Sequence, residues 1–324
     1  MSTSTATAAA CPNIAFIKYW GNRNAALRIP LNGSISMNLA GLETRTSVRF
    51  DESLSADHFI LNGQAQAGKP LQRVSTFMDV IRGLAYQQQF ASVVSENNFP
   101  SGAGIASSAS AFAALALAGS QAAGLNLPEK DLSRLARRGS GSAARSIPEG
   151  FVEWQAGYAD EDSFAYSIAR PEYWNLVDVI AIVDPLEKAT GSSEGHNLAA
   201  TSPLNKLRQN GVDDRLAICR EAILHQDFTA FAEVVEADSN WMHAVMRTSN
   251  PPLYYWRPFT EVILWQVVEW RKAGHAVCAT VDAGPNVHIL ALETETAWLK
   301  AELSQLQGVK DLILAKPGSG AVLV

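Results

Sequence analysis

The chain is organised around the stretch Asn97-Asn98-Phe99-Pro100-Ser101-Gly102-Ala103-Gly104-Ile105-Ala106-Ser107-Ser108-Ala109-Ser110. The alternating run at 91–95 before it predicts a strand, and the Ala- and Leu-rich run from about 107 to 123 predicts a helix. A Gly/Ser loop that leads into a helix can bind an anion, because the first N–H groups of a helix are unpaired and carry partial positive charge. A tight turn with a serine N-cap fits the same pattern, and no Lys follows Gly104 as a Walker A loop would require.

Composition limits the classes of protein that this chain can belong to. Its 324 residues, 47% of them hydrophobic and 18% charged, describe a soluble globular protein of one large domain or two lobes. The net charge of −6 argues against a general nucleic-acid binder but allows a local basic pocket. The spacing of Cys11, Cys219 and Cys278 forms no disulfide framework or metal cluster, which favours the cytoplasm. We expect neither a secretory signal nor a membrane-spanning helix.

The order of the predicted elements mixes strands and helices. The patterns predict an α+β protein with two lobes, residues 1–186 and 187–324, separated near residues 184–195. Strands are expected at 8–18, 34–39, 45–50, 58–61, 151–154, 163–168, 176–183, 277–282, 287–292 and 309–314. Helices are expected at 71–86, 107–123, 127–138 and 295–306, and through most of 195–272 with breaks near Gly211 and at Pro251-Pro252.

Four segments carry the side chains that chemistry would need. They are Lys18-Tyr19-Trp20, the loop 101–108, the loop 140–145 that ends in Arg145, and the turn that begins with Asp282. A lysine beside a phenol can face an anion, an arginine fork can grip a carboxylate or phosphate, and an aspartate at the end of a strand can act as a general base. Each segment also has an ordinary structural interpretation, namely a strand end with interfacial aromatics, a flexible turn or a turn cap.

Two candidate phosphate loops and one acid together indicate transfer of a phosphoryl group from a nucleotide. Such a reaction needs positioning, cations and a group that aligns or deprotonates the hydroxyl nucleophile. The residues by themselves therefore indicate an ATP-dependent small-molecule kinase, or an enzyme that uses that step. The six histidines show no ligand spacing, so we expect no direct protein metal cluster. We expect Mg²⁺ to be bound through ATP, with Ser107 as a candidate ligand from the protein.

The segment 100–108 resembles the phosphate loop of the GHMP kinase superfamily. Within that superfamily, four segments spread over residues 13–286 look like those of the mevalonate diphosphate decarboxylases. These segments are Asn13-Ile14-Ala15-Phe16-Ile17-Lys18-Tyr19-Trp20-Gly21, Ser95-Glu96-Asn97-Asn98-Phe99-Pro100, Arg138-Gly139-Ser140-Gly141-Ser142-Ala143-Ala144-Arg145-Ser146 and Asp282-Ala283-Gly284-Pro285-Asn286. The resemblance implies a two-lobed GHMP-kinase fold with a deep cleft, and a homodimer.

The resemblance also implies a reaction in the mevalonate pathway of isoprenoid biosynthesis. ATP phosphorylates the 3-hydroxyl of a mevalonate phosphate, and loss of phosphate and CO2 follows. Asp282 would act at the 3-hydroxyl, Arg145 would hold the C1 carboxylate, and Lys18 would lie at the reacting centre. The implied substrate-binding residues are Tyr19, Trp20, Gly21, Asn22, Arg73, Ser140, Gly141, Ser142, Ala143, Ala144, Ser193 and Glu194. The implied ATP-binding residues are Ser95, Asn97, Ser101, Gly102, Ala103, Gly104, Ala106, Ser107 and Ser108.

The chain departs from the family pattern where the second phosphate of the substrate would lie. Asn22 replaces the usual Lys, and Glu194 stands where many members have Arg or a neutral residue, while Arg73 is retained. Fewer cations and an added carboxylate disfavour a diphosphate, so we expect mevalonate 5-phosphate as substrate and isopentenyl phosphate as product. The alternatives are a diphosphomevalonate decarboxylase, a 3-kinase that does not decarboxylate, and a non-catalytic binding protein.

Overall fold

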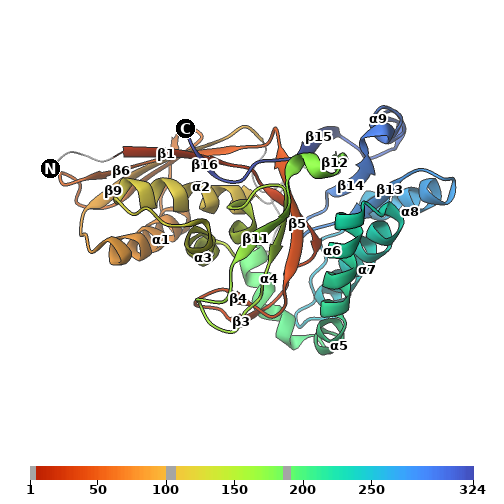
Figure 1. The fold of residues 1–324 in the computed structure, drawn as a ribbon, viewed down its shortest axis with the longest axis horizontal. Coiled ribbons are helices and arrows are strands. Elements are labelled where there is room, and N and C mark those ends of the chain that lie inside the picture. Colours follow the sequence, from red (N-terminus) through yellow and green to blue (C-terminus); the bar gives the residue numbers. More distant parts are fainter. Residues whose placement is uncertain (1–4, 100–106, 185–190) are drawn as a thin grey trace.

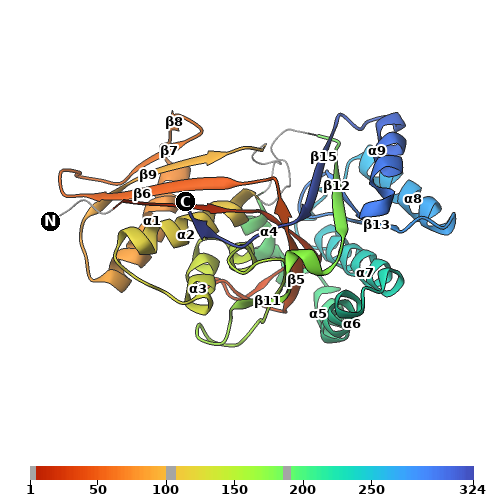
Figure 2. The same ribbon diagram turned by 45° about the horizontal axis from the view of Figure 1, so that its top comes forward.

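A computed structural model of the chain describes residues 5–99, 107–184 and 191–324, without the side chains of residues 192 and 193. One of its sheets has the strand order β16-β1-β6-β9-β7-β8, with β7 parallel to β9 and the other neighbours antiparallel. Figure 1 labels β1, β6, β9 and β16 of this sheet, and Figure 2 labels β7 and β8. These strands are β1 (Thr5–Ala10), β6 (Thr44–Asp51), β7 (His58–Leu61), β8 (Gln64–Ala65), β9 (Phe90–Asn97) and β16 (Val322–Leu323).

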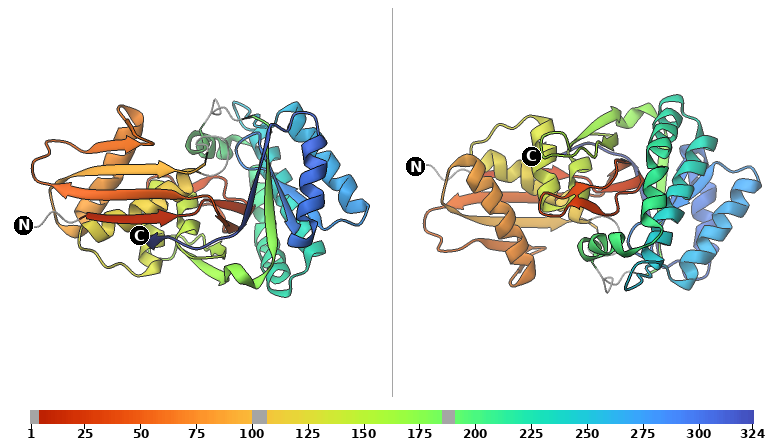
Figure 3. Two further views of the ribbon diagram at one scale, coloured as in Figure 1. Left: turned by 90° about the horizontal axis from the view of Figure 1, so that it is seen from above. Right: turned by 90° about the horizontal axis from the view of Figure 1, so that it is seen from below.

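Helices cover one face of this sheet (Figure 3). Strand β6 alternates between buried and outward residues, so Val48 and Phe50 point into a core that α1 (Lys69–Ala85) and α2 (Ser107–Ala122) complete. Most of α2 is Ala and Leu, and it is buried over nearly its whole length between the sheet, α1 and α3 (Glu129–Gly139). The start of α2 is thereby held at one end of the sheet.

The other large sheet has the order β11-β10-β5-β15-β12-β14-β13, and β2 pairs with β5 outside this path. Its strands are β2 (Asn13–Ile17), β5 (Ser34–Ala40), β10 (Phe151–Trp154), β11 (Ala165–Ala169), β12 (Leu176–Ile182), β13 (Val277–Thr280), β14 (Val287–Leu292) and β15 (Asp311–Pro317). Helices α6 (Val212–His225) and α7 (Phe228–Arg247) pack on one face of its β12–β14 part, and α8 (Pro258–Lys272) and α9 (Thr296–Gln305) pack on the other (Figure 2).

Short elements connect and border the sheets. They are the hairpin of β3 (Asn22–Asn24) and β4 (Ile29–Pro30), α4 (Ser192–Leu198), α5 (Asn205–Asn210) and the 3-10 helices η1 (Gly141–Ser146), η2 (Pro171–Tyr173), η3 (Ala199–Thr201) and η4 (Glu293–Glu295). In the described part of the chain, no helix combines the length and apolar character needed to cross a bilayer.

The predicted α+β class is confirmed, and most predicted elements lie within a few residues of those observed. The single strand expected at 8–18 is wrong, because β1 and β2 are separated at Cys11 and Pro12, and proline has no N–H for a sheet hydrogen bond. The loop expected after Arg138 is mostly the helix η1. Strand β13 ends at Thr280, so Asp282 lies in the turn beyond it. The division near residue 186 stays a prediction, and β15 and β16 return from the C-terminal segment to pair with β5 and β1.

Phe231 of α7 joins the helices to the N-terminal strands. Its ring packs edge-on against Phe16 of β2, with 4.8 Å between centroids, and both rings are fully buried. We expect Phe231→Ala to lower the free energy of unfolding by about 3–5 kcal/mol, because a cavity would remain between helix and sheet. Urea denaturation measures this loss. Trp265→Ala, at an aromatic that is 63% exposed, is the control and should have a far smaller effect.

Candidate active site

Lys18 and Asp282 form the centre of the site. Lys18 follows β2 and Asp282 follows β13, and Lys18 Nζ lies 2.5 Å from Asp282 Oδ1. The lysine side chain is 1% exposed, whereas that of the aspartate is 25% exposed. The pair therefore presents a carboxylate to the outside, with the ammonium group behind it.

A buried aspartate fixes the backbone of Lys18. Asp238 of α7 accepts a hydrogen bond of 2.6 Å from the Lys18 N–H, and it also pairs with Arg208 and Arg215. Arg208 in turn donates to the Lys18 carbonyl over 2.7 Å, as does Asn32 over 3.0 Å. Both backbone polar groups of Lys18 are thus held, which restricts where its side chain can point.

The charges around Asp282 keep it ionised. Burial alone would raise the pKa of Asp282, but the effects of Lys18 first, and then of His288 and Arg145, outweigh it and hold the pKa below its ordinary value. Burial lowers the pKa of Lys18, and the Asp282 carboxylate opposes that shift. An ionised carboxylate that is partly exposed can accept or align a proton of a hydroxyl group.

Arg145 lies in the last turn of η1 and is 3% exposed. Its guanidinium donates to Ser34 Oγ over 2.6 Å and to Asn13 Oδ1 over 3.2 and 3.0 Å. Burial lowers its pKa to about 10, and no carboxylate pairs with it among the described residues. A guanidinium held by neutral oxygens keeps its full charge for an anionic ligand.

Tyr19 lies beside this centre. Its hydroxyl donates to Asn22 Oδ1 over 2.5 Å, and its ring stacks on His196 of α4, whose Nδ1 accepts the Gly21 N–H. A Cβ on Gly141 would lie 2.4 Å from the Tyr19 ring, so the close contact requires glycine there. Burial raises the pKa of Tyr19 to about 12, against the effect of nearby positive charges, of which Arg28 acts most.

The loop 140–145 and the start of α2 meet at one hydrogen bond. Ser108 Oγ lies 3.2 Å from Ser140 Oγ, and Ser140 Oγ lies 3.4 Å from Ser142 Oγ. Ala143 and Ala144 are fully buried, backbone included, so neither presents a surface to a ligand in this structure. The predicted phosphate-loop helix and the predicted substrate loop are therefore adjacent.

A cavity of about 180 Å³ lies on the other side of the α2 start. Its lining consists of Phe59, Leu61, Pro70, Arg73, Val74, Ser95, Asn97, Ser107, Ser108, Ala111, Phe112 and Leu115. Its walls are largely apolar, with serine hydroxyls and the N-terminus of α2 at one side. This combination fits a nucleotide, whose base is planar and apolar and whose phosphates are anionic. The predicted residues Ser101, Gly102, Ala103, Gly104 and Ala106 lie outside the described residues.

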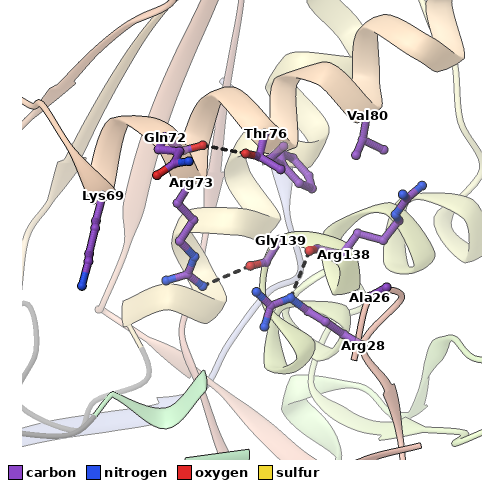
Figure 4. A pocket seen from close by; sticks show the side chains of 10 residues that line it. Ala26, Arg28, Lys69, Gln72, Arg73, Thr76, Val80, Arg138 and Gly139 are labelled. Carbon is purple, nitrogen blue, oxygen red and sulfur yellow. Dashed lines mark hydrogen bonds between the residues drawn. The ribbon is translucent and has the colours of Figure 1, made fainter. Parts of the chain in front are cut away.

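A second cavity, of about 380 Å³, borders Arg73 (Figure 4). Arg73 donates to the Gly139 carbonyl over 3.0 Å, immediately before the Ser140 loop. Trp20 is buried and packs near Gly195 in α4, where Glu194 is exposed. The side chain of Ser193 lies outside the described part of the structure. Of the predicted residues, the structure thus groups Lys18, Asp282 and Arg145 at the centre, with Tyr19 and the Ser140 loop beside them.

Three histidines lie next to the site residues and hold hydrogen bonds there, a role that their spacing in the sequence did not predict. His243 of α7 donates to the carbonyl of Val281, next to Asp282, over 3.1 Å, and burial lowers its pKa to about 3, so it is neutral. His288 donates to Asp178 over 2.6 Å behind the turn, and both are buried. His196 contacts Tyr19 as described above. No group of His, Cys, Asp or Glu suited to a metal ion occurs among the described residues.

This geometry can be compared with known proteins. The fold and the site, with a carboxylate, a lysine and an arginine beside the start of α2, fit an ATP-dependent carboxy-lyase of the GHMP-kinase type, the class that the sequence resemblance implied. Residues 10–165 match the family model of the diphosphomevalonate decarboxylase-like N-terminal domain, and residues 178–317 match that of the mevalonate 5-diphosphate decarboxylase C-terminal domain. The chain belongs to the mevalonate diphosphate decarboxylase family.

Named relatives and solved structures agree with this assignment. The chain is 40% identical to the diphosphomevalonate decarboxylase of Ganoderma lucidum, covering 89% of this chain and 78% of that protein. It is 37% identical to the human diphosphomevalonate decarboxylase, and the match covers 90% of this chain and 78% of the human protein. It is similar to mevalonate diphosphate decarboxylase from Staphylococcus aureus, with a TM-score of 0.95, 38% identity, and 100% and 98% of the two chains covered. It is also similar to mevalonate diphosphate decarboxylase from Enterococcus faecalis, with a TM-score of 0.93 and 39% identity; the match covers 100% of this chain and 99% of that chain.

Asp282 is the one carboxylate that contacts Lys18 Nζ among the described residues. We expect Asp282→Asn to lower kcat by at least about 10²-fold, because the variant loses the proton acceptor. Nucleotide binding, measured by titration calorimetry, should be retained. Asp227→Asn is the control, since Asp227 caps α7 at an exposed position and Asn also caps helices well. Turnover within tenfold of wild type would contradict the role of Asp282.

Arg145 makes hydrogen bonds with two neutral side chains through different nitrogens. A lysine cannot reproduce this fork, so we expect Arg145→Lys to raise KM and lower kcat together, by tenfold or more in kcat/KM. Steady-state kinetics of CO2 release measures both parameters. Arg170→Lys, at a side chain that is 83% exposed, should change neither. Wild-type kinetics for Arg145→Lys would mean that the fork does not grip a ligand.

Proposed function

We propose that this protein decarboxylates mevalonate 5-diphosphate at the expense of ATP, giving isopentenyl diphosphate, CO2, ADP and phosphate. The observation that carries the proposal is the Lys18–Asp282 pair beside Arg145, which forms no salt bridge with a carboxylate among the described residues. The named relatives of 37–40% identity are diphosphomevalonate decarboxylases. A solved relative of 39% identity was determined in complex with MVAPP, AMPPCP and magnesium.

The residues divide the reaction between them. Asp282 aligns the tertiary 3-hydroxyl and takes its proton, while Arg145 orients the C1 carboxylate. ATP with Mg²⁺, when bound, supplies the phosphoryl group that turns the hydroxyl into a good leaving group. The C3–O bond and the C1–C2 bond then break, and the electron pair of C1–C2 becomes the C2=C3 double bond. Lys18 offers positive charge to the oxygen that departs from C3.

The cavity beside α2 is our candidate for the nucleotide. Ser107 and Ser108 lie in the first turn of α2, where the helix dipole favours phosphate. Ser95 and Asn97 line the same cavity from β9, and Asn97 Oδ1 accepts a hydrogen bond of 2.7 Å from Thr44 Oγ1. The cofactors predicted from the sequence, ATP and Mg²⁺, correspond to the nucleotide analogue and the metal of the solved complex.

Mevalonate 5-phosphate, the substrate expected from residues 22 and 194, is the second candidate. Asn22 brings no charge, and its Oδ1 is engaged by Tyr19, which favours this candidate. Glu194 favours the 5-phosphate less than the sequence suggested, because its carboxylate is exposed to solvent. Its charge acts on Tyr255, whose pKa is raised to about 12 by burial and, to a smaller extent, by Glu194. The names of the relatives fit the 5-diphosphate better. A homodimer and a cytoplasmic location stay predictions.

Release of CO2 with ATP and Mg²⁺, measured in parallel for mevalonate, its 5-phosphate and its 5-diphosphate, tests the proposal. We expect the largest kcat/KM with the 5-diphosphate and very little turnover of mevalonate. A larger kcat/KM with the 5-phosphate would establish the second candidate. ADP formation without CO2 would instead show a 3-kinase, and no product from any of the three would overturn the assignment as an enzyme.

A further inference from the structure

The cavity of about 380 Å³ beside α1 carries unusual charge. Its lining contains Arg28, Lys69, Arg73 and Arg138 but no Asp or Glu. None of the four pairs with a carboxylate among the described residues, although the chain as a whole is acidic. By contrast, the buried Arg137 pairs with Asp160, and the buried Arg208 pairs with Asp238. A cluster of unpaired cations around a cavity favours an anionic ligand.

Two of these cations converge. Arg28 Nε donates to the Arg138 carbonyl over 3.0 Å, and Arg73 Nη2 donates to the Gly139 carbonyl over the same distance. Figure 4 shows both guanidinium groups directed to the same space below Gly139, whereas the side chain of Arg138 runs the other way, toward Val80. Arg73 is also stacked on Phe112, with 4.5 Å to the ring centroid. Backbone carbonyls one residue apart therefore hold two like charges together.

Such an arrangement is unfavourable without a ligand, because each cation disfavours the charge of the other. Desolvation and then the charge of Arg28 lower the pKa of Arg73 to about 10, although Arg73 as a whole residue is exposed, so the arrangement of the two guanidinium groups carries more weight than this shift. A phosphate oxygen placed between two guanidinium groups relieves the repulsion and receives several charge-assisted hydrogen bonds. The geometry thus suits a group with more than one negative charge.

Arg28 is held in its place by the backbone. It lies in the hairpin between β3 and β4 with φ of 51°, a conformation that residues other than glycine rarely adopt, and its N–H donates to the Ala25 carbonyl over 3.3 Å. Among the nearby charges, that of Arg28 lowers the pKa of the Tyr19 hydroxyl most. Arg28 and Arg73 thus hold the backbone at Arg138 and Gly139, directly before the Ser140 loop, whose Gly141 contacts the Tyr19 ring.

Resting on the proposed function, in which Arg73 is already an implied substrate-binding residue, we infer that Arg28 joins it at the terminal phosphate of the 5-diphosphate substrate and is a specificity-determining residue. The substrate would extend from Asp282 and Arg145 past Tyr19 to this pair. Arg28 supplies positive charge at the end of the site where Asn22 supplies none. The phosphates of ATP are the other possible source of the anion, since Arg73 also lines the nucleotide cavity.

Arg28→Asn is the variant of choice, because asparagine removes the charge and tolerates positive φ. Arg23→Asn is the matched control, since Arg23 belongs to the same hairpin but is exposed and stacks on Tyr158 at 4.2 Å. We expect Arg28→Asn to raise KM for the 5-diphosphate about tenfold or more, with kcat and KM for ATP nearly unchanged. KM for the 5-phosphate should change much less, and Arg23→Asn should behave like wild type.

The outcomes separate this inference from the proposed function. If wild type decarboxylates the 5-diphosphate and Arg28→Asn does so with the same KM, the role of Arg28 is overturned while the function stands. If Arg28→Asn raises KM for ATP alone, Arg28 and Arg73 bind the nucleotide instead, and the proposed role of Arg28 in substrate binding is also overturned. Binding of the 5-diphosphate without ATP, measured by calorimetry, should weaken by the same factor in Arg28→Asn. Equal melting temperatures of the three proteins would exclude a folding effect.

Discussion

Asp238 is a carboxylate with no exposure to solvent, and the arrangement of the site depends on how its charge is compensated. A buried charge is tolerated only when it is paired and hydrogen-bonded, and removal of one partner is strongly destabilising. Here the partners come from α5, from α6 and from the backbone at the end of β2. The same carboxylate that joins these elements therefore fixes the position of Lys18. The hydrogen bonds and ion pairs of Asp238 therefore stabilise the fold and place Lys18 at the same time.

The cations of the site have a different kind of support. Arg145 rests on a serine and an asparagine, and Arg28 and Arg73 rest on backbone carbonyls, so none of them is neutralised by the groups that hold it. Neutral partners fix the direction of a guanidinium without using up its charge. The cost is repulsion among like charges in the protein without ligands. An anionic substrate removes that cost on binding, which is how preorganised electrostatic sites work.

The centre of the site could be predicted because its residues lie in short, specific motifs. Lys18, Arg145 and Asp282 each stand beside glycine or aromatic residues in an order that few folds share, and the structure brings them together. The supporting residues could not be predicted in this way. Asp238 and His243 occupy ordinary helical positions, and only the packing of α7 on the sheet brings them to the site. Arg28 was not among the predicted site residues, because its position depends on how the hairpin of β3 and β4 folds. The charges counted around the second phosphate, from Asn22 and Glu194, therefore did not include it.

The strand order of the second sheet has a consequence for synthesis of the chain. Strand β12 is buried over its whole length between β14 and β15, both of which lie more than a hundred residues later in the sequence. Until the ribosome has released those strands, the apolar run 176–182 has both edges unpaired and no sheet to join. Late pairing of this kind slows folding and exposes strands that aggregate. The nascent chain should therefore depend on chaperones more than the finished protein does.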